Sequence, residues 1–127
     1  MAVARRFTRK PPFRAGSAQA GWGASHFADL WYVFDHLDRD SASWTAADRR
    51  LAAVITGYWT RFAATGDPNG PGLPRWPRFE DPSRGPMMNL GTSISPGPVA
   101  NLAGLKAFDA AYDQIRGTPL PTRSGTR

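Results

Sequence analysis

The chain has 127 residues, of which 41% are apolar and 12% aromatic, and this composition suits one small domain with a buried core. It contains no cysteine, which excludes disulfide scaffolds, thiol nucleophiles and cysteine-bound zinc. Its 13 glycines and 12 prolines predict many turns and irregular connections, and they argue against a helical bundle.

The net charge of +6 comes from the two ends of the chain. All ten acidic residues lie between Ala15 and Ile115, whereas eight of the 16 basic residues lie outside this range: Arg5, Arg6, Arg9, Lys10, Arg14, Arg116, Arg123 and Arg127. We therefore expect basic, solvated and flexible ends over residues 1–20 and 117–127. Phe7 and Phe13 among these cations leave nucleic-acid binding open, but solvation is the favoured interpretation.

Targeting signals are not evident in the sequence. The basic segment Met1–Lys10 is not followed by the apolar core of a secretion signal. No stretch approaches the roughly 20 apolar residues that a membrane helix needs. We predict no membrane span, and the localisation of the protein stays undetermined.

The first third of the chain predicts a strand, a loop and a helix. Val3–Thr8 alternates weakly between apolar and polar residues, which is typical of a short strand. Arg14–Gly23 is small and polar, and suits a surface loop. A helix should begin just after His26, because four apolar residues then follow the spacing of one helical face: Phe27, Leu30, Trp31 and Phe34.

The strongest helix pattern is Ala46–Ala64. Thr45 suits its N-cap, and Asp48 stands where a carboxylate can reach back to the N–H of the cap. Gly66 should end the helix in the left-handed conformation. One apolar stripe runs along it, formed by Leu51, Ile55, Tyr58, Trp59 and Phe62. Its aromatic members Tyr58, Trp59 and Phe62 could line an acyl pocket, but helical spacing favours a core role.

The remainder predicts an extended segment, one short strand and a closing helix. Prolines force an extended path over Leu73–Phe79, where burial of Trp76 is the expected anchor. Met88 and Leu90 alternate as in a strand. A last amphipathic helix should end at Gly117, with its apolar side formed by Leu102, Leu105, Phe108, Tyr112 and Ile115.

Several sequence motifs resemble, in their order along the chain, those of a known family. The segment Gly23–Phe34 reads Gly-Ala-Ser-His-Phe-Ala-Asp-Leu-Trp-Tyr-Val-Phe. It is similar to the Gly-Ala-x-His-x-x-Glu-x-x-Tyr-Val-Phe segment around the catalytic histidine of type B carboxylesterases and cholinesterases. Three further phrases of that family follow at matching spacing: Tyr58–Ala63, Thr65–Asn69 and Leu73–Pro77.

The resemblance implies the fold and a partial active site. It implies an α/β fold, namely the C-terminal portion of an α/β-hydrolase with the last short strands, two or three helices and an incomplete sheet, over residues 1–127. His26 matches the histidine that accepts the serine proton and returns it to the leaving alkoxide. The nucleophile of this fold sits in Gly-x-Ser-x-Gly, and no serine of the chain has glycines at both of these positions.

The resemblance gives Asp29 a supporting role. The family has glutamate at this position beside a separate triad acid, so the expected role is support of the histidine loop or of the helix that follows it, with direct orientation of His26 as the alternative. Phe27 and Trp31 also depart from the family pattern, which places a small residue and a proline there. His36 lies in a polar stretch and is expected to face solvent.

Two hypotheses of different class follow. In the first, the chain is the C-terminal segment of a serine carboxylic ester hydrolase, supplies His26, and acts on esters only together with the upstream part of the domain. No cofactor or metal is implied, because metal-ligand spacing and nucleotide fingerprints are absent. In the second, the chain is a non-catalytic remnant that binds a partner protein or, through its basic ends, nucleic acid.

Overall fold

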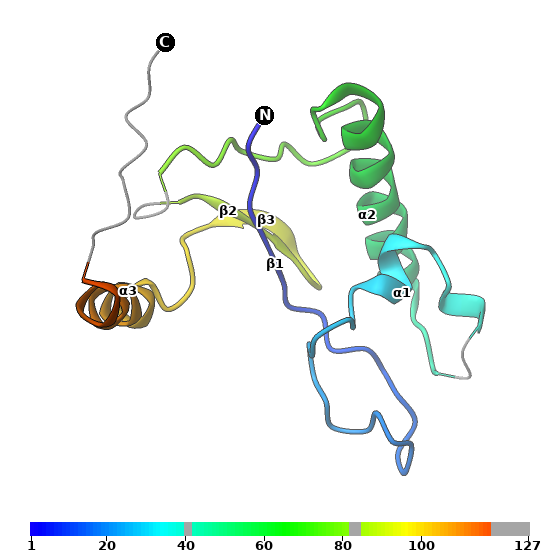
Figure 1. Cartoon of the computed structure of the whole chain (residues 1–127). Coiled ribbons are helices and arrows are strands. Elements are labelled where there is room, and N and C mark those ends of the chain that lie inside the picture. Colours follow the sequence, from blue (N-terminus) through cyan, green and yellow to red (C-terminus); the bar gives the residue numbers. More distant parts are fainter. Residues whose placement is uncertain (40–41, 82–84, 118–127) are drawn as a thin grey trace.

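The computed structural model describes residues 1–39, 42–81 and 85–117. Strand β1 (Arg5–Phe7) is followed by helix α1 (Leu30–Val33), a 3₁₀ turn (Leu37–Arg39) and helix α2 (Ala46–Thr65). Strands β2 (Met87–Leu90) and β3 (Ile94–Gly97) then precede helix α3 (Leu102–Arg116). In Figure 1, α1 lies against α2, whereas α3 lies apart from both, beyond the sheet.

The sheet has the strand order β1-β2-β3. β1 runs parallel to β2, with Arg5 opposite Met88 and Phe7 opposite Leu90. β3 returns antiparallel, with Ile94 opposite Leu90. The predicted strands at Val3–Thr8 and around Met88 are confirmed. β3 was not expected, since its Ser-Pro-Gly sequence has low strand propensity, and a proline is tolerated because β3 pairs on one side only.

Helix α2 is built as the sequence predicts and forms one wall of the core. Thr45 and Asp48 make the reciprocal capping box, and Gly66 ends the helix at φ +73°. Its inward side chains Leu51, Ile55 and Tyr58 are buried. They belong to a core cluster with Tyr32, Trp76, Met88 and Leu90, so the expected burial of Trp76, which is 3% exposed, is confirmed.

The helix expected just after His26 is shorter and turned differently. α1 begins only at Leu30, because Phe27 adopts φ +67°, which an α-helix cannot continue through. The expected apolar face does not pack inward either: Phe27, Leu30 and Phe34 are exposed. The buried residue of α1 is Tyr32, whose hydroxyl donates to the buried carboxylate of Asp48.

Helix α3 is confirmed, and it ends at Gly117 with φ +66°. Its apolar side chains are not covered, since no residue of this helix is buried. Leu105 is 49% exposed and Ile115 81% exposed. Within the described part of the chain, α3 is therefore an amphipathic helix without a packed apolar face.

Candidate active site around His26

His26 lies in a turned segment that leads from the surface loop into α1. The turns are closed by backbone hydrogen bonds from Ala28 N–H to the Ser25 carbonyl and from Leu30 N–H to the Phe27 carbonyl, both 3.0 Å. The imidazole is exposed, and its ring centre lies 3.8 Å from that of Phe27. A histidine held by a short turned segment, with its ring open to solvent, is accessible for proton transfer.

The backbone next to His26 is unusual. Phe27 has φ +67°, a left-handed conformation that is uncommon for a bulky L-residue. Such a conformation costs on the order of 1 kcal/mol or more, and it persists only where the surroundings fix it. The segment after His26 is therefore constrained by contacts beyond its own local preferences.

One of these contacts is made by Asp29. Its Oδ2 accepts a hydrogen bond from Arg5 Nη2 at 2.6 Å, and the Asp29 side chain is only 16% exposed. Asp29 occupies the N-cap position of α1, yet its side chain makes no capping hydrogen bond. In the part of the chain that the structure describes, no hydrogen bond joins Asp29 to His26. The two predicted site residues thus share one turned segment, but the carboxylate is bound to β1.

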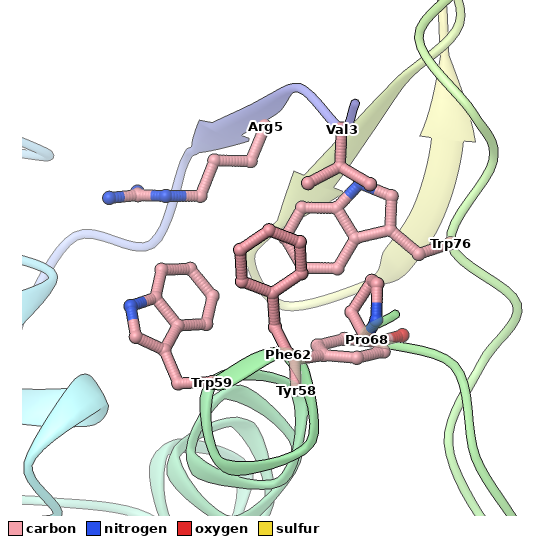
Figure 2. Close-up of a pocket in the computed structure, with 7 residues that line it drawn as sticks. All are labelled: Val3, Arg5, Tyr58, Trp59, Phe62, Pro68 and Trp76. Carbon is pink, nitrogen blue, oxygen red and sulfur yellow. The ribbon is translucent and has the colours of Figure 1, made fainter. Parts of the chain in front are cut away.

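Arg5 also forms one side of a small apolar pocket (Figure 2). Its guanidinium lies over the Trp59 ring, 5.0 Å from the ring centre. The pocket encloses about 140 Å³ and is lined by Val3, Arg5, Tyr58, Trp59, Phe62, Pro68 and Trp76. Its polar groups bind inside the chain: Tyr58 donates to the Pro74 carbonyl, and Trp76 Nε1 donates to the Ala4 carbonyl. Burial raises the pKa of Tyr58 to about 12.

His26 itself borders a second pocket of about 170 Å³. Trp22, Phe27 and Trp31 contribute aromatic surface beside the imidazole, together with Phe13, Gln19, Ser25 and Ala28. An adjoining groove continues along the exposed side of α1 to His36, which is exposed as expected. The candidate general base therefore stands at the edge of apolar surface.

A buried carboxylate fixes α1 to the rest of the fold. Asp48 is 0% exposed and accepts from Arg9 Nε at 2.6 Å, Arg9 Nη2 at 2.8 Å and the Tyr32 hydroxyl at 2.9 Å. The N–H and hydroxyl of Thr45 donate to its second oxygen. The carboxylate thereby joins the segment after β1, helix α1 and the start of α2.

The ionisation of this group follows from its contacts. Burial alone would raise the pKa of Asp48, but the hydrogen bonds from Arg9, Thr45 and Tyr32 outweigh it and hold the pKa well below its usual range. Burial, followed by the contact with Asp48, raises the pKa of Tyr32. The hydrogen bond to Asp48 also raises the pKa of Arg9. The ion pair stays charged and Tyr32 stays neutral near pH 7.

These contacts correct the expectation for the basic N-terminal end. Arg9 is not solvated, since its side chain is 19% exposed and binds the buried Asp48. Arg5 is bound to Asp29. The proposed tail 117–127 lies, except for Gly117, outside the described residues. The capping pattern of Asp48 was readable from the sequence, but its pairing with Arg9, 39 positions away, had no local signal.

The described residues lack two features. None of their helices is both long and apolar enough to cross a membrane. No cluster of three or more His, Cys, Asp or Glu side chains among them could hold a metal ion.

Solved structures place this arrangement in a known fold. The chain superposes on a thermophilic PNB esterase with a TM-score of 0.64 at 24% identity, over 80% of this chain and 20% of that protein. A second PNB esterase gives a TM-score of 0.62 at 22% identity. Both are α/β-hydrolases, and the three strands and three helices are thus part of an α/β-hydrolase fold.

The sequence comparisons give the family. The family model described as "Carboxylesterase family" matches residues 4–104, and the chain belongs to that family. Carboxylesterase 3 of Pongo abelii is 36% identical over 80 residues, which cover 58% of this chain and 14% of that protein. Cocaine esterase of Homo sapiens is 32% identical over 72 residues, 56% of this chain and 13% of that protein. The chain thus spans about one seventh of the length of these relatives.

Proposed function

We propose that His26 is the general base and acid of a carboxylic ester hydrolase whose serine nucleophile and triad acid come from polypeptide outside these 127 residues. The observation that carries the proposal is an exposed histidine, in a constrained turned segment beside an apolar pocket, within a chain of the carboxylesterase family. An imidazole with accessible nitrogens can take the proton of a hydroxyl during attack on an ester and deliver it to the leaving alkoxide.

The remaining groups of the chain fit this division of roles. Asp29 is bound to Arg5 and Asp48 to Arg9, so neither of these carboxylates is placed to orient the imidazole. The serines of the chain lack the flanking glycines that a nucleophile elbow needs. On this proposal the chain alone does not hydrolyse esters, and the upstream part of the hydrolase domain completes the site.

A chimera tests the proposal. The segment of the thermophilic PNB esterase that superposes on this chain is replaced by the chain, and hydrolysis of p-nitrophenyl acetate is followed. His26→Ala should lower kcat by about 10³-fold or more, because the loss of one triad member removes nearly all triad catalysis. His36→Ala is the matched control and should leave kcat unchanged, because His36 is exposed beyond α1.

Two results would contradict the proposal. One is a chimera that keeps its esterase activity after His26→Ala. The other is hydrolysis of the ester by the 127-residue chain alone, at a rate that depends on His26. Circular dichroism of each chimera shows whether the exchanged segment is folded, and only folded chimeras enter the comparison.

The non-catalytic alternative loses part of its support. Two of the five basic residues at the N-terminal end, Arg5 and Arg9, have carboxylate partners inside the fold. Both cations are thus partly neutralised where a phosphate would have to bind.

A further inference from the structure

The histidine segment and the sheet are joined by one side chain, Arg5. The backbone of Arg5 is fixed in β1 by its pairing with Met88 of β2. Its guanidinium lies over the ring of Trp59 on α2 (Figure 2). Its Nη2 donates to Asp29 at 2.6 Å. Three elements that are distant in the sequence therefore meet at this cation.

The side chain of Asp29 binds the neighbouring strand rather than its own helix, and the Asp29 backbone is already helical, with φ −74° and ψ −20°. An aspartate at an N-cap commonly accepts hydrogen bonds from the N–H groups of the first helical turn. The Asp29 side chain makes no such bond and turns to Arg5 instead. The left-handed Phe27 lies between His26 and this anchor, where an external contact is needed to hold a strained backbone.

We infer that Arg5 is a positioning residue for His26. The Arg5 guanidinium lies over the Trp59 ring and binds the Asp29 carboxylate. It thereby holds the turned segment that carries His26 against β1. The catalytic meaning of this role rests on the proposed function, whereas the contact can be tested without catalysis. It also gives Asp29 one task, which is to anchor the segment.

The electrostatic consequence separates this role from general structural support. Arg5 and Asp29 form an ion pair of opposite charges, and Asp29 lies three residues after His26 in the sequence. Removal of the cation leaves a carboxylate that favours the imidazolium, and removal of the carboxylate leaves a cation that opposes it. The two substitutions should therefore act on His26 in opposite directions, whereas a mere loosening of the segment would move both variants toward one common value.

The test uses NMR titration of the 127-residue chain, which contains two histidines. Arg5→Gln should raise the midpoint of the His26 titration, and Asp29→Asn should lower it, each by on the order of 0.3–0.5 pH unit, the size expected for one charge near a protein surface. The double variant should return to the starting value. His36 serves as the internal reference.

Arg6→Gln is the matched control. It removes the same charge from the next strand residue, which points to the opposite face of the sheet. It should move the His26 midpoint much less than Arg5→Gln does. An equal effect of both variants, or shifts of the same sign in Arg5→Gln and Asp29→Asn, would overturn the inference. If Arg5→Gln unfolds the chain, Asp29→Asn alone provides the test, because it changes no residue of β1. A His26 midpoint that is unchanged or raised in Asp29→Asn rejects the positioning role of Arg5.

The chimera separates this inference from the proposed function. There, Arg5→Gln should lower kcat about tenfold with little change in KM, because a misplaced base slows the chemical step rather than binding. Arg6→Gln should change neither constant. If the proposed function is wrong, the chimera keeps its activity after His26→Ala, while the two opposite shifts of the His26 midpoint are still observed. If the positioning role is wrong, the opposite shifts of the His26 midpoint are not observed, although the activity of the chimera still depends on His26.

Discussion

Helices α2 and α3 share an apolar stripe and a terminal glycine, but they differ in which residues cover the stripe. Both carry an apolar stripe, and both end at a glycine in the left-handed conformation, with φ +73° at Gly66 and +66° at Gly117. In α2 the stripe residues Leu51, Ile55 and Tyr58 are buried in the core cluster, whereas Phe62, for which a core role was expected, is 42% exposed and lines the pocket of Figure 2. In α3 no residue is buried.

This difference shows what helical periodicity encodes. The spacing of apolar residues predicts which side of a helix is apolar, but it does not predict which element covers that side. For α2 the cover lies within the described chain. For α3, and for the exposed Phe27, Leu30 and Phe34 around α1, it does not. The proposed function accounts for both surfaces, because the rest of a hydrolase domain would supply the missing cover.

The largest effect is expected at the buried end of α2. Asp48→Ala leaves Arg9 and the Tyr32 hydroxyl without their shared acceptor, so the free energy of unfolding should fall by about 3–5 kcal/mol, as for other broken buried pairs. Denaturant unfolding measures it. Asp38→Ala is the control: it breaks the solvent-exposed pair with Arg49 and should lower the free energy of unfolding far less than Asp48→Ala does. Equal costs would contradict the role of Asp48.

One substitution can be made in both helices. Ile55→Ala removes a side chain that is 1% exposed and should cost about 2–5 kcal/mol. Ile115→Ala removes one that is 81% exposed and should change the free energy of unfolding by less than about 0.5 kcal/mol. Thermal and denaturant unfolding of the two variants give the comparison. A large cost at Ile115 would mean that α3 is packed in solution.

Acid should destabilise the α2 side through Asp48. The folded-state pKa of this carboxyl lies below the unfolded value of about 3.9, so its contribution is fully present above that pH and is lost as the pH falls below it. Unfolding free energies measured from about pH 6 down to about pH 2 should therefore decrease with falling pH, with the decrease beginning near the unfolded-state pKa of Asp48. In Asp48→Asn the decrease should be smaller, and an equal decrease in both proteins would exclude Asp48 as its source.

The sequence predicted the parts of the fold that local rules decide. Thr45, Asp48 and Gly66 mark the ends of α2 by capping chemistry, which acts within a few residues. Trp76 could be predicted as an anchor, because the prolines around it leave few hydrogen bonds to stabilise that segment.

The contacts across the chain could not be predicted in this way. Nothing near Arg9 indicates a partner 39 positions later, and nothing near Arg5 indicates Asp29 or Trp59. The segment after His26 shows the limit most clearly. Helical spacing predicted that Phe27 belongs to α1, but its backbone is left-handed, and the anchor at Arg5 lies outside any local window. Candidate residues of the site were readable from the sequence, but their partners were not.

A smaller effect than at Asp48 or Ile55 is expected at the glycines that end the two helices, and it distinguishes α2 from α3. Alanine at a left-handed position costs about 1–2 kcal/mol, because its Cβ approaches the following carbonyl oxygen. At Gly66 the cost should appear in the global free energy of unfolding, since α2 belongs to the core. At Gly117 it should appear only as fraying of the last turn of α3, seen as a small loss of helical circular dichroism at an unchanged unfolding midpoint. A lowered midpoint in Gly117→Ala would show that α3 unfolds together with the core.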